Sequence, residues 1–495
     1  MFLRHARPWS QQDWLAARAQ ATPERPALYR GGEVWTYADL DRQVDQVARG
    51  LRAQGMGPGR RVAFWRLPRR DALVLVWAVA RVGAVLVPFH GRWTPREGRM
   101  AARVVAPHLL VVPEDASEAR AMGVPTVSWE ALRAPQDPRG ASAEASVPRA
   151  LGEVQGVVFT SGSTGRPKAA TLTWRQHFWS AWASAARLGL EARDAWLLTL
   201  PLYHVGGLAI LWRSVLYGIP VLLPPQEGSF DPQGWLRSTL PRRPSLISVV
   251  PTMLYRILEA GMTPWPELRV VLVGGAAAPE ALLEEALARG WPVALTYGLT
   301  EAASQVATAP PELVRRKPGT VGPPLLFTRV VARDATGRPL PPGEVGEITV
   351  QGPTVFLGYW GNEEATARAL RDGWLYTGDE GYVDEEGHLW VKGRAAFAIN
   401  TGGEKVYPQE VENVLLQHPA VAQACVVGLP DEEWGQRVAA AVVLRPEHRV
   451  TAEDLARFCR KHLAGFKVPR RWVFVAELPR TASGKLDRRK VQSLF

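Results

Sequence analysis

Short apolar runs alternate with helix-length amphipathic stretches along most of this chain. Runs of about four to eight apolar residues are typical of buried strands, whereas the stretches between them repeat apolar residues with the helical period. This alternation favours βα units arranged around mainly parallel sheets. The pattern of hydrophobic and polar positions therefore predicts an α/β fold.

One βα unit is especially clear in the middle of the chain. The apolar run 270–273 predicts a buried strand, and Pro279 suits the first position of a helix that we expect over 280–289. Gly290 ends that helix, and the next strand is expected over 292–296. Both strands run into loops at their carboxyl ends, where open α/β sheets place ligands.

The pattern changes in the C-terminal half of the chain. From Gly343 onward, short alternating strands separated by turn residues, such as 347–350 and 387–391, indicate a β-rich lobe. After Gly393 a new α/β pattern begins, with a helix expected at 408–417, strands at 421–428 and 437–444, and a helix at 452–462. We predict a large N-terminal domain of α/β sheets plus this β-rich lobe (1–393), a hinge (394–397) and a small α+β C-terminal domain (398–495). The Pro-, Ala- and Ser-rich stretch 136–149 is expected to be a surface connection.

Composition and charge narrow the classes of function. With 495 residues, of which 46% are apolar and 22% charged, the sequence is typical of a soluble globular protein with more than one domain. The net charge of +11 comes from arginines that are dispersed along the chain instead of gathered into basic arms. That dispersion disfavours nucleic-acid binding.

The sequence favours a cytoplasmic protein without a membrane span. Its two cysteines, Cys425 and Cys459, are far apart in the sequence and indicate neither a disulfide framework nor a zinc site. Charged residues come too early at the N-terminus for a secretory signal. The most apolar stretch, 72–89, is interrupted by Arg81 and is too short to cross a bilayer, so we expect a buried helix and strand there.

Residues 160–168, Thr-Ser-Gly-Ser-Thr-Gly-Arg-Pro-Lys, are typical of a phosphate-binding loop. Glycines let several backbone N–H groups turn toward one phosphate, and Lys168 would add a positive charge. Lys168 is the first of only 8 lysines among 59 basic residues. The run differs from a Walker A loop because Arg166 and Pro167 separate the glycine from the lysine. A flexible surface turn is the alternative for the loop alone, but the buried-type strand 156–159 before it aims the loop at a ligand.

Four further segments complete the set of motifs. They are Thr-Tyr-Gly-Leu-Thr-Glu at 296–301, Trp-Leu-Tyr-Thr-Gly-Asp at 374–379 followed by Arg394, Asn-Thr-Gly-Gly-Glu-Lys-Val-Tyr-Pro-Gln-Glu at 400–410, and Leu-Pro-Arg-Thr-Ala-Ser-Gly-Lys at 478–485. In this order the motifs resemble those of the adenylate-forming enzymes, which include acyl-CoA and aryl-CoA synthetases, luciferases and peptide-synthetase adenylation domains. The resemblance covers about residues 20–495 and implies that the C-terminal domain is mobile.

The resemblance implies a site for ATP and Mg²⁺. Its ATP-binding residues would be Thr160, Ser161, Gly162, Ser163, Thr164, Gly165, Lys168, Thr296, Tyr297, Gly298, Leu299, Thr300, Asp379, Arg394 and Lys485. Thr160 and Glu301 would hold the metal, and Lys485, His204, Thr300 and Glu301 would be catalytic. Taken alone, each segment has a structural alternative: a helix start at Thr300, a turn at Asp379, and an exposed lysine at 485.

For coenzyme A, the resemblance implies that Gly402, Gly403 and Lys405 line the thiol's approach. The sequence departs from the family pattern beside this segment. Ala396 and Phe397 replace residues that are commonly acidic or polar at the hinge, and this puts the polar anchoring of the hinge in doubt.

The acyl substrate is expected to lie near His204, Gly274, Gly275, Ala276 and Ser304. A packed core histidine is the alternative for His204. The Ser304-Gln305 pair, together with the segments 274–279 and 320–325, is similar to o-succinylbenzoate-CoA ligases of menaquinone biosynthesis. Small residues at 274–278 would leave room for a planar ring.

The resemblance therefore implies an ATP-dependent carboxylate-CoA ligase that forms an acyl-adenylate from a small carboxylic acid. Another aryl- or medium-chain acyl-CoA synthetase is the alternative within this class, and a non-catalytic nucleotide-binding homologue is the alternative outside it. A homodimer is the family-level expectation.

Overall fold

The computed structural model describes residues 13–134, 150–160, 168–225, 227–228, 230–236, 242–402, 404–432, 434–481 and 486–495. These residues form a mixed α/β fold of four sheets, which confirms the predicted fold class. Within the described ranges, no helix has the length and apolar character that crossing a membrane requires.

The largest sheet has eight strands, and its central strands are parallel. In spatial order they are β14 (Ser304–Ala309), β13 (Val293–Leu299), β12 (Val270–Val273), β11 (Leu246–Val249), β9 (Trp196–Leu197), β10 (Val221–Leu223), β1 (Pro26–Arg30) and β2 (Glu33–Thr36). The predicted strand at 270–273 is confirmed with the same bounds. The next strand is three residues longer than expected at its carboxyl end, because Tyr297, Gly298 and Leu299 continue the pairing with β14.

A second sheet has seven strands and carries the Ser/Gly-rich loop. Its order is β17 (Gly358–Tyr359), β8 (Lys168–Thr173), β7 (Val154–Thr160), β4 (Val85–Pro88), β3 (Arg61–Phe64), β5 (Leu109–Val112) and β6 (Thr126–Ser128). Strand β7 is parallel to β4 but antiparallel to β8. The loop at 160–168 therefore joins two neighbouring strands.

Apolar residues from both large sheets meet in one core with several helices. The helices that surround the sheets are α1 (Trp14–Ala21), α2 (Tyr37–Ala53), α3 (Arg69–Val82), α4 (Pro95–Val105), α5 (Trp129–Arg133), α6 (Trp174–Leu188), α7 (Val205–Tyr217), α8 (Pro232–Leu236), α9 (Pro251–Glu259), α10 (Glu280–Ala288) and α11 (Pro311–Arg316). As predicted, the apolar stretch 72–89 is a buried helix followed by a buried strand. Arg81 is tolerated there because it pairs with Asp13, Asp41 and Asp45.

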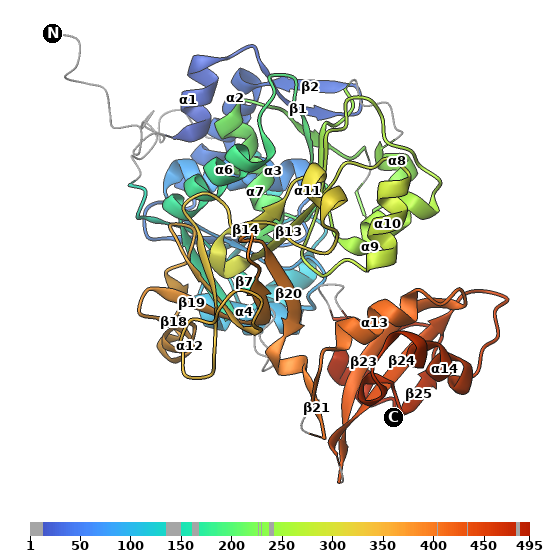
Figure 1. The fold of residues 1–495 in the computed structure, drawn as a ribbon. Helices are drawn as coiled ribbons and strands as arrows, with labels where there is room; N and C mark the ends of the chain where they lie inside the picture. Colours follow the sequence, from blue (N-terminus) through green and yellow to red (C-terminus); the bar gives the residue numbers. More distant parts are fainter. Residues whose placement is uncertain are drawn as a thin grey trace.

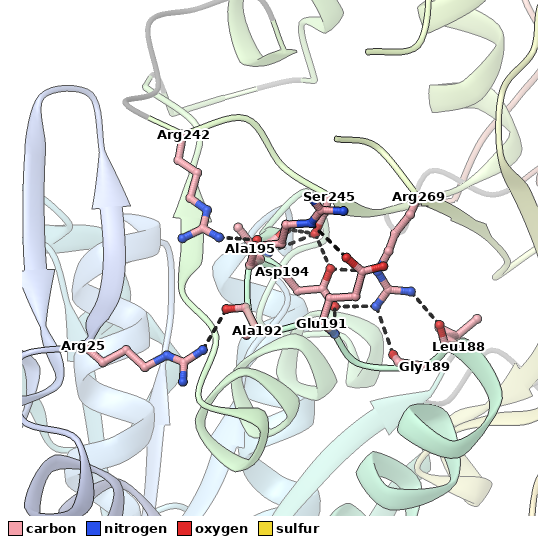
Figure 2. Close-up of polar contacts among 11 residues, drawn as sticks. Arg25, Leu188, Gly189, Glu191, Ala192, Asp194, Ala195, Arg242, Ser245 and Arg269 are labelled. Carbon is pink, nitrogen blue, oxygen red and sulfur yellow. Dashed lines mark hydrogen bonds and ion pairs between the residues drawn. The ribbon is translucent and has the colours of Figure 1, made fainter. Parts of the chain in front are cut away.

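A polar network pins the amino ends of three parallel strands (Figure 2). Asp194, just before β9, is fully buried and accepts hydrogen bonds from Arg269, just before β12, and from the Ser245 hydroxyl, just before β11, at 2.7 Å from each. Burial alone would raise the pKa of Asp194, but the hydrogen bonds from Arg269, the Glu191 backbone and Ser245 lower it overall. The network fixes these strands at the edge opposite the loops that carry the candidate site.

The β-rich lobe is a third sheet, made of β15 (Arg329–Arg333), β16 (Gly346–Gln351), β18 (Leu370–Arg371), β19 (Trp374–Val383) and β20 (Leu389–Arg394), with α12 (Glu363–Ala369) beside it. The fourth sheet comprises β21 (Ile399–Thr401), β22 (Glu404–Val406), β23 (Val421–Asp431), β24 (Gly435–Leu444) and β25 (Arg471–Phe474), with α13 (Pro408–Leu416), α14 (Ala452–His462) and α15 (Arg488–Gln492). In Figure 1 this last group, in orange and red, lies to one side of the other sheets. Its segments agree closely with the pattern predicted after Gly393.

One expectation about local structure, the position of Pro279, needs correction, and another, the connection at 136–149, stays a prediction. Pro279 precedes α10 as its N-cap instead of being its first residue, and Gly290 follows the helix with a φ of 79°. The predicted connection at 136–149 lies outside the described residues. Cys425 and Cys459 are both buried, unpaired thiols.

Candidate active site

The loops that hold the predicted site residues leave the carboxyl ends of parallel strands. His204 lies beyond β9, Gly274 follows β12, and Thr300 follows β13. Because β9, β11, β12 and β13 are parallel neighbours, these loops lie at the same edge of the eight-stranded sheet. The fold therefore brings together motifs that are about a hundred residues apart in the sequence.

The two ends of the phosphate-type loop are held by strand pairing. Thr160 ends β7, Lys168 begins β8, and these two residues are direct partners in the antiparallel ladder. The Thr160 hydroxyl also donates to the Lys168 carbonyl oxygen at 3.4 Å. The other predicted members of this loop (Ser161, Gly162, Ser163, Thr164 and Gly165) lie outside the described residues.

Tyr359 links Lys168 to Glu301. The Lys168 ammonium lies 5.0 Å from the centre of the Tyr359 ring, and the Tyr359 hydroxyl donates to Glu301 Oε1 at 2.8 Å. Burial, and then the negative charge of Glu301, raise the pKa of Tyr359, so this phenol remains a donor. Tyr359 was missed in the sequence because it belongs to none of the motifs; pairing of β17 with β8 brings it to the site.

A second cluster joins the segment 296–301 to the Asp379 motif. Tyr297 donates its hydroxyl proton to Asp379 Oδ2 at 2.6 Å, and Arg394 Nε lies 2.8 Å from Asp379 Oδ1. Burial and the charge of Asp379 raise the pKa of Tyr297 well above its usual value. The predicted association of Asp379 with Arg394 is present. Each carboxylate oxygen has a protein partner, and a carboxylate oxygen can accept more than one hydrogen bond.

Thr300 and Glu301 form a 3₁₀ turn over Thr300–Ala302, not the start of an α-helix. The chain cannot continue as a helix because Ala303 and Ser304 adopt positive φ angles of 51° and 102°. Such angles are strained in residues with a side chain and cluster at functional sites. Gly298 permits this turn, since a Cβ there would lie 1.8 Å from the Ser304 carbonyl oxygen.

The predicted acyl-site residues differ in burial. Ser304 and His204 are half-buried, whereas Gly275 and Ala276 are exposed. Gly274 has a packing reason of its own, because a Cβ would lie 2.6 Å from the Thr296 methyl group. His204 is the N-cap of α7, with its ring 4.7 Å from Tyr203 and 5.5 Å from His90. His204 is thus packed against two rings but only half-buried, and its role at the acyl site stays a prediction.

Arg213 of α7 is a residue that the sequence reasoning missed. Its side chain is 2% exposed, and no carboxylate among the described residues pairs with it. Its Nη2 lies 3.5 Å from the Ser180 hydroxyl, which donates to the Ala303 carbonyl oxygen at 2.7 Å. A buried cation without a carboxylate partner is costly. The signal was an arginine inside the apolar helical run 208–215.

The coenzyme A segment is only partly described. Gly402 has a φ of 58°, and a Cβ there would lie 2.5 Å from the Trp434 ring, so glycine is required for both reasons. Lys405 pairs with Glu380 at 2.8 Å. Gly403 and Lys485 lie outside the described residues.

The residues present fit Mg²⁺ that is bound mainly through nucleotide phosphates. Glu301 offers one carboxylate, in which the Tyr359 hydroxyl donates to Oε1 and not to Oε2, and Thr160 offers a hydroxyl. Mg²⁺ commonly takes one or two carboxylates beside phosphate oxygens and water. The described residues contain no cluster of three or more His, Cys, Asp or Glu that would hold a metal by itself.

Comparison with known proteins agrees with this geometry. The model of the AMP-binding enzyme family matches residues 15–360, and that of the AMP-binding enzyme C-terminal domain matches residues 410–485. The chain belongs to the AMP-binding enzyme family. Like other members of this family, it joins a large N-terminal region to a smaller C-terminal one.

Within the AMP-binding enzyme family, several of the similar proteins are named for one substrate, 2-succinylbenzoate (o-succinylbenzoate). A 2-succinylbenzoate–CoA ligase from Bacillus mycoides is 39% identical over 97% of this chain and 98% of its own length. Two structures of o-succinylbenzoate CoA synthetase from Bacillus subtilis, each 35% identical, match 97% of this chain. The complex with the acyl-adenylate OSB-AMP has a TM-score of 0.90 over 98% of its chain, and the complex with ATP and magnesium has 0.91 over 99%. A double mutant of the same enzyme with the product analogue OSB-NCoA has a TM-score of 0.74, again at 35% identity, covering 98% of both chains.

Proposed function

We propose that this protein is an ATP-dependent, AMP-forming ligase that joins 2-succinylbenzoate to coenzyme A. The observation that carries the choice of acid is the similarity to 2-succinylbenzoate–CoA ligases over nearly the whole of both chains. The clusters around Glu301 and Asp379 support the nucleotide half of the proposal, since Glu301 follows β13 and Tyr297, near the carboxyl end of β13, holds Asp379 of the β-rich lobe there.

In the first step, one substrate carboxylate attacks the α-phosphorus of ATP, the bond to pyrophosphate breaks, and an acyl-adenylate stays bound. Asp379 accepts the ribose hydroxyls, while Tyr297 and Arg394 hold its carboxylate in place. Glu301 and Thr160 hold Mg²⁺, whose charge offsets that of the phosphates. Lys168 faces the leaving pyrophosphate, and Lys485 approaches the reacting carboxylate.

In the second step, the thiol of coenzyme A attacks the acyl carbonyl carbon, and AMP leaves. Gly402, Gly403 and Lys405 line the thiol's path, and His204 stands at the acyl site. The domain limits 1–393, 394–397 and 398–495 belong to this proposal, as do a cytoplasmic location and a homodimer. The C-terminal domain rotates between the two steps, and such closures often limit turnover.

The substrate has a second carboxylate that does not react, and Arg213 is our candidate for binding it. Arg213 lies behind Ser180 and the Ala303 carbonyl, next to the strained turn that presents Ser304. An anion at this position would compensate a cation that the described residues leave without a carboxylate. This assignment also favours a dicarboxylic substrate over a monocarboxylic benzoate or fatty acid.

Pyrophosphate release with a panel of acids tests the proposal. The protein is incubated with ATP, Mg²⁺ and 2-succinylbenzoate, benzoate or medium-chain fatty acids, and coenzyme A is then added to detect the thioester. We expect release only with 2-succinylbenzoate; release with benzoate or fatty acids instead would favour the other synthetases. Lys485→Ala should slow adenylate formation far more than thioester formation from supplied acyl-adenylate, and an equal loss would contradict its role.

A further inference from the structure

Glu380 connects the β-rich lobe to the C-terminal sheet. It lies on β19 directly after Asp379, and its two carboxylate oxygens take two partners from the other side of the predicted hinge. Lys405 Nζ of β22 lies 2.8 Å from Glu380 Oε1, and the Tyr407 hydroxyl donates to Oε2 at 2.6 Å. The Glu380 side chain is 13% exposed, so these contacts are partly shielded from water.

The surroundings of Glu380 favour both contacts. Burial, and then the hydrogen bond and charge of Glu380, raise the pKa of Tyr407, so its hydroxyl stays protonated as a donor. Gly393 of β20 has a φ of 147°, an angle that favours glycine, and a Cβ there would only make an ordinary contact with the Tyr407 ring at 4.0 Å. On the same sheet Glu347 lies opposite Glu380 in the ladder, so the cation of Lys405 also offsets two neighbouring negative charges.

The hinge itself lacks the polar residues that the family pattern led us to expect. Ala395, Ala396 and Phe397 form a 3₁₀ turn, and Phe397 is 43% exposed, with the Arg488 guanidinium 5.7 Å from its ring. Arg488 is already bound to Glu412 of α13. Polar contacts between the two regions come instead from Glu380 of β19 and from Tyr255 of α9, which interacts with Arg445.

We propose that Glu380 is a positioning residue that latches the C-terminal region in the arrangement used for adenylate formation. This inference rests on the proposed two-step function. The structure has a TM-score of 0.91 with the ATP and magnesium complex and 0.74 with the OSB-NCoA complex of the same enzyme, so its arrangement is closer to the former. Lys405 belongs to the segment predicted to line the path of coenzyme A, and its bond to Glu380 must open when that segment turns toward the thiol.

The latch predicts a change in the ratio of the two half-reactions. Glu380→Ala removes the hydrogen bond from Tyr407 to a carboxylate and the exposed ion pair with Lys405. Their loss lowers the population of the latched arrangement, relative to the rotated one, by about tenfold. If the latched state dominates, the rate of adenylation changes little while the rotated state becomes more populated. Glu380→Ala should therefore raise the ratio of thioesterification to adenylation about tenfold, and Tyr407→Phe should raise it less.

The test measures both half-reactions with the full-length protein. Adenylation is followed as pyrophosphate release from ATP and 2-succinylbenzoate without coenzyme A, and thioesterification as product from supplied acyl-adenylate and coenzyme A. Glu386→Gln is the matched control, because it removes an ion pair with Lys317 inside the N-terminal region and should leave the ratio unchanged. A ratio that stays constant or falls in both Glu380→Ala and Tyr407→Phe, with the wild type active, would overturn the latch. A wild type that forms no adenylate from 2-succinylbenzoate would overturn the proposed function, and the latch with it.

Discussion

Replacing Tyr359 with phenylalanine tests the contact that joins Lys168 to Glu301. The change removes one hydroxyl and keeps the ring, so the approach of Lys168 to the aromatic face is retained. What is lost is the 2.8 Å hydrogen bond to Glu301 Oε1. A hydrogen bond to a charged group contributes about 1.5–3 kcal/mol, and Glu301 is half-buried, so we take about 1.5–2 kcal/mol.

This free energy corresponds to roughly a 10- to 30-fold effect. Because Glu301 is our proposed ligand for Mg²⁺, we expect the loss as a higher Mg²⁺ concentration for half-maximal pyrophosphate release, with partial recovery at high Mg²⁺. The assay is a Mg²⁺ titration of pyrophosphate release from ATP and 2-succinylbenzoate. Tyr382→Phe is the control, since Tyr382 stacks on Trp390 on the same lobe, away from Glu301. An unchanged Mg²⁺ dependence, or an equal loss in thioesterification from supplied acyl-adenylate, would refute the reasoning.

Three further predictions follow from buried groups. Arg213→Met should leave thermal stability equal or higher, because it removes a buried cation that has no carboxylate partner among the described residues. The KM for 2-succinylbenzoate should rise about a hundredfold, and an unchanged KM would rule out Arg213 as the partner of the second carboxylate. Arg269→Met should lower the free energy of unfolding in denaturant by about 3–5 kcal/mol, because it leaves Asp194 as an uncompensated buried carboxylate. A loss below about 1 kcal/mol would contradict the role of the network in Figure 2. Burial, with a smaller effect of Arg213, lowers the pKa of His177 to about 3. Below about pH 6.5 the unfolded chain therefore binds a proton that the folded chain does not. The free energy of unfolding should fall as the pH drops toward 3, by up to about 1.4 kcal/mol per pH unit. His177→Gln should flatten that slope between about pH 6.5 and 4.5, and an identical slope would show that another group is responsible.

Local signals in the sequence predicted the elements well where apolar runs end at clear breakers. The strand 270–273 ends at Gly274 and the helix at 452–462 begins after a Thr451 cap, and both were predicted with the bounds that the structure has. The 3₁₀ turn at Thr300 was not predictable in this way. It depends on the close approach of Ser304 to Gly298, which is a contact between two strands.

The same distinction holds for the candidate site. Asp379 and Arg394 were associated by their spacing, and they are partners because β19 and β20 pair at these two residues. Tyr359, Arg213 and Glu380 were missed because their partners are far away in the sequence. Each becomes visible only when a strand pairing, a buried helix or a neighbouring sheet brings the two side chains together.

The most direct test of the account is product formation by the purified protein with ATP, Mg²⁺, coenzyme A and 2-succinylbenzoate. Mass spectrometry of the thioester is combined with quantification of AMP and pyrophosphate. We predict 2-succinylbenzoyl-CoA, with one AMP and one pyrophosphate per thioester, and a kcat/KM that exceeds the values for benzoate and medium-chain acids. Formation of ADP, or thioester formation with those acids but not with 2-succinylbenzoate, would contradict the proposed function.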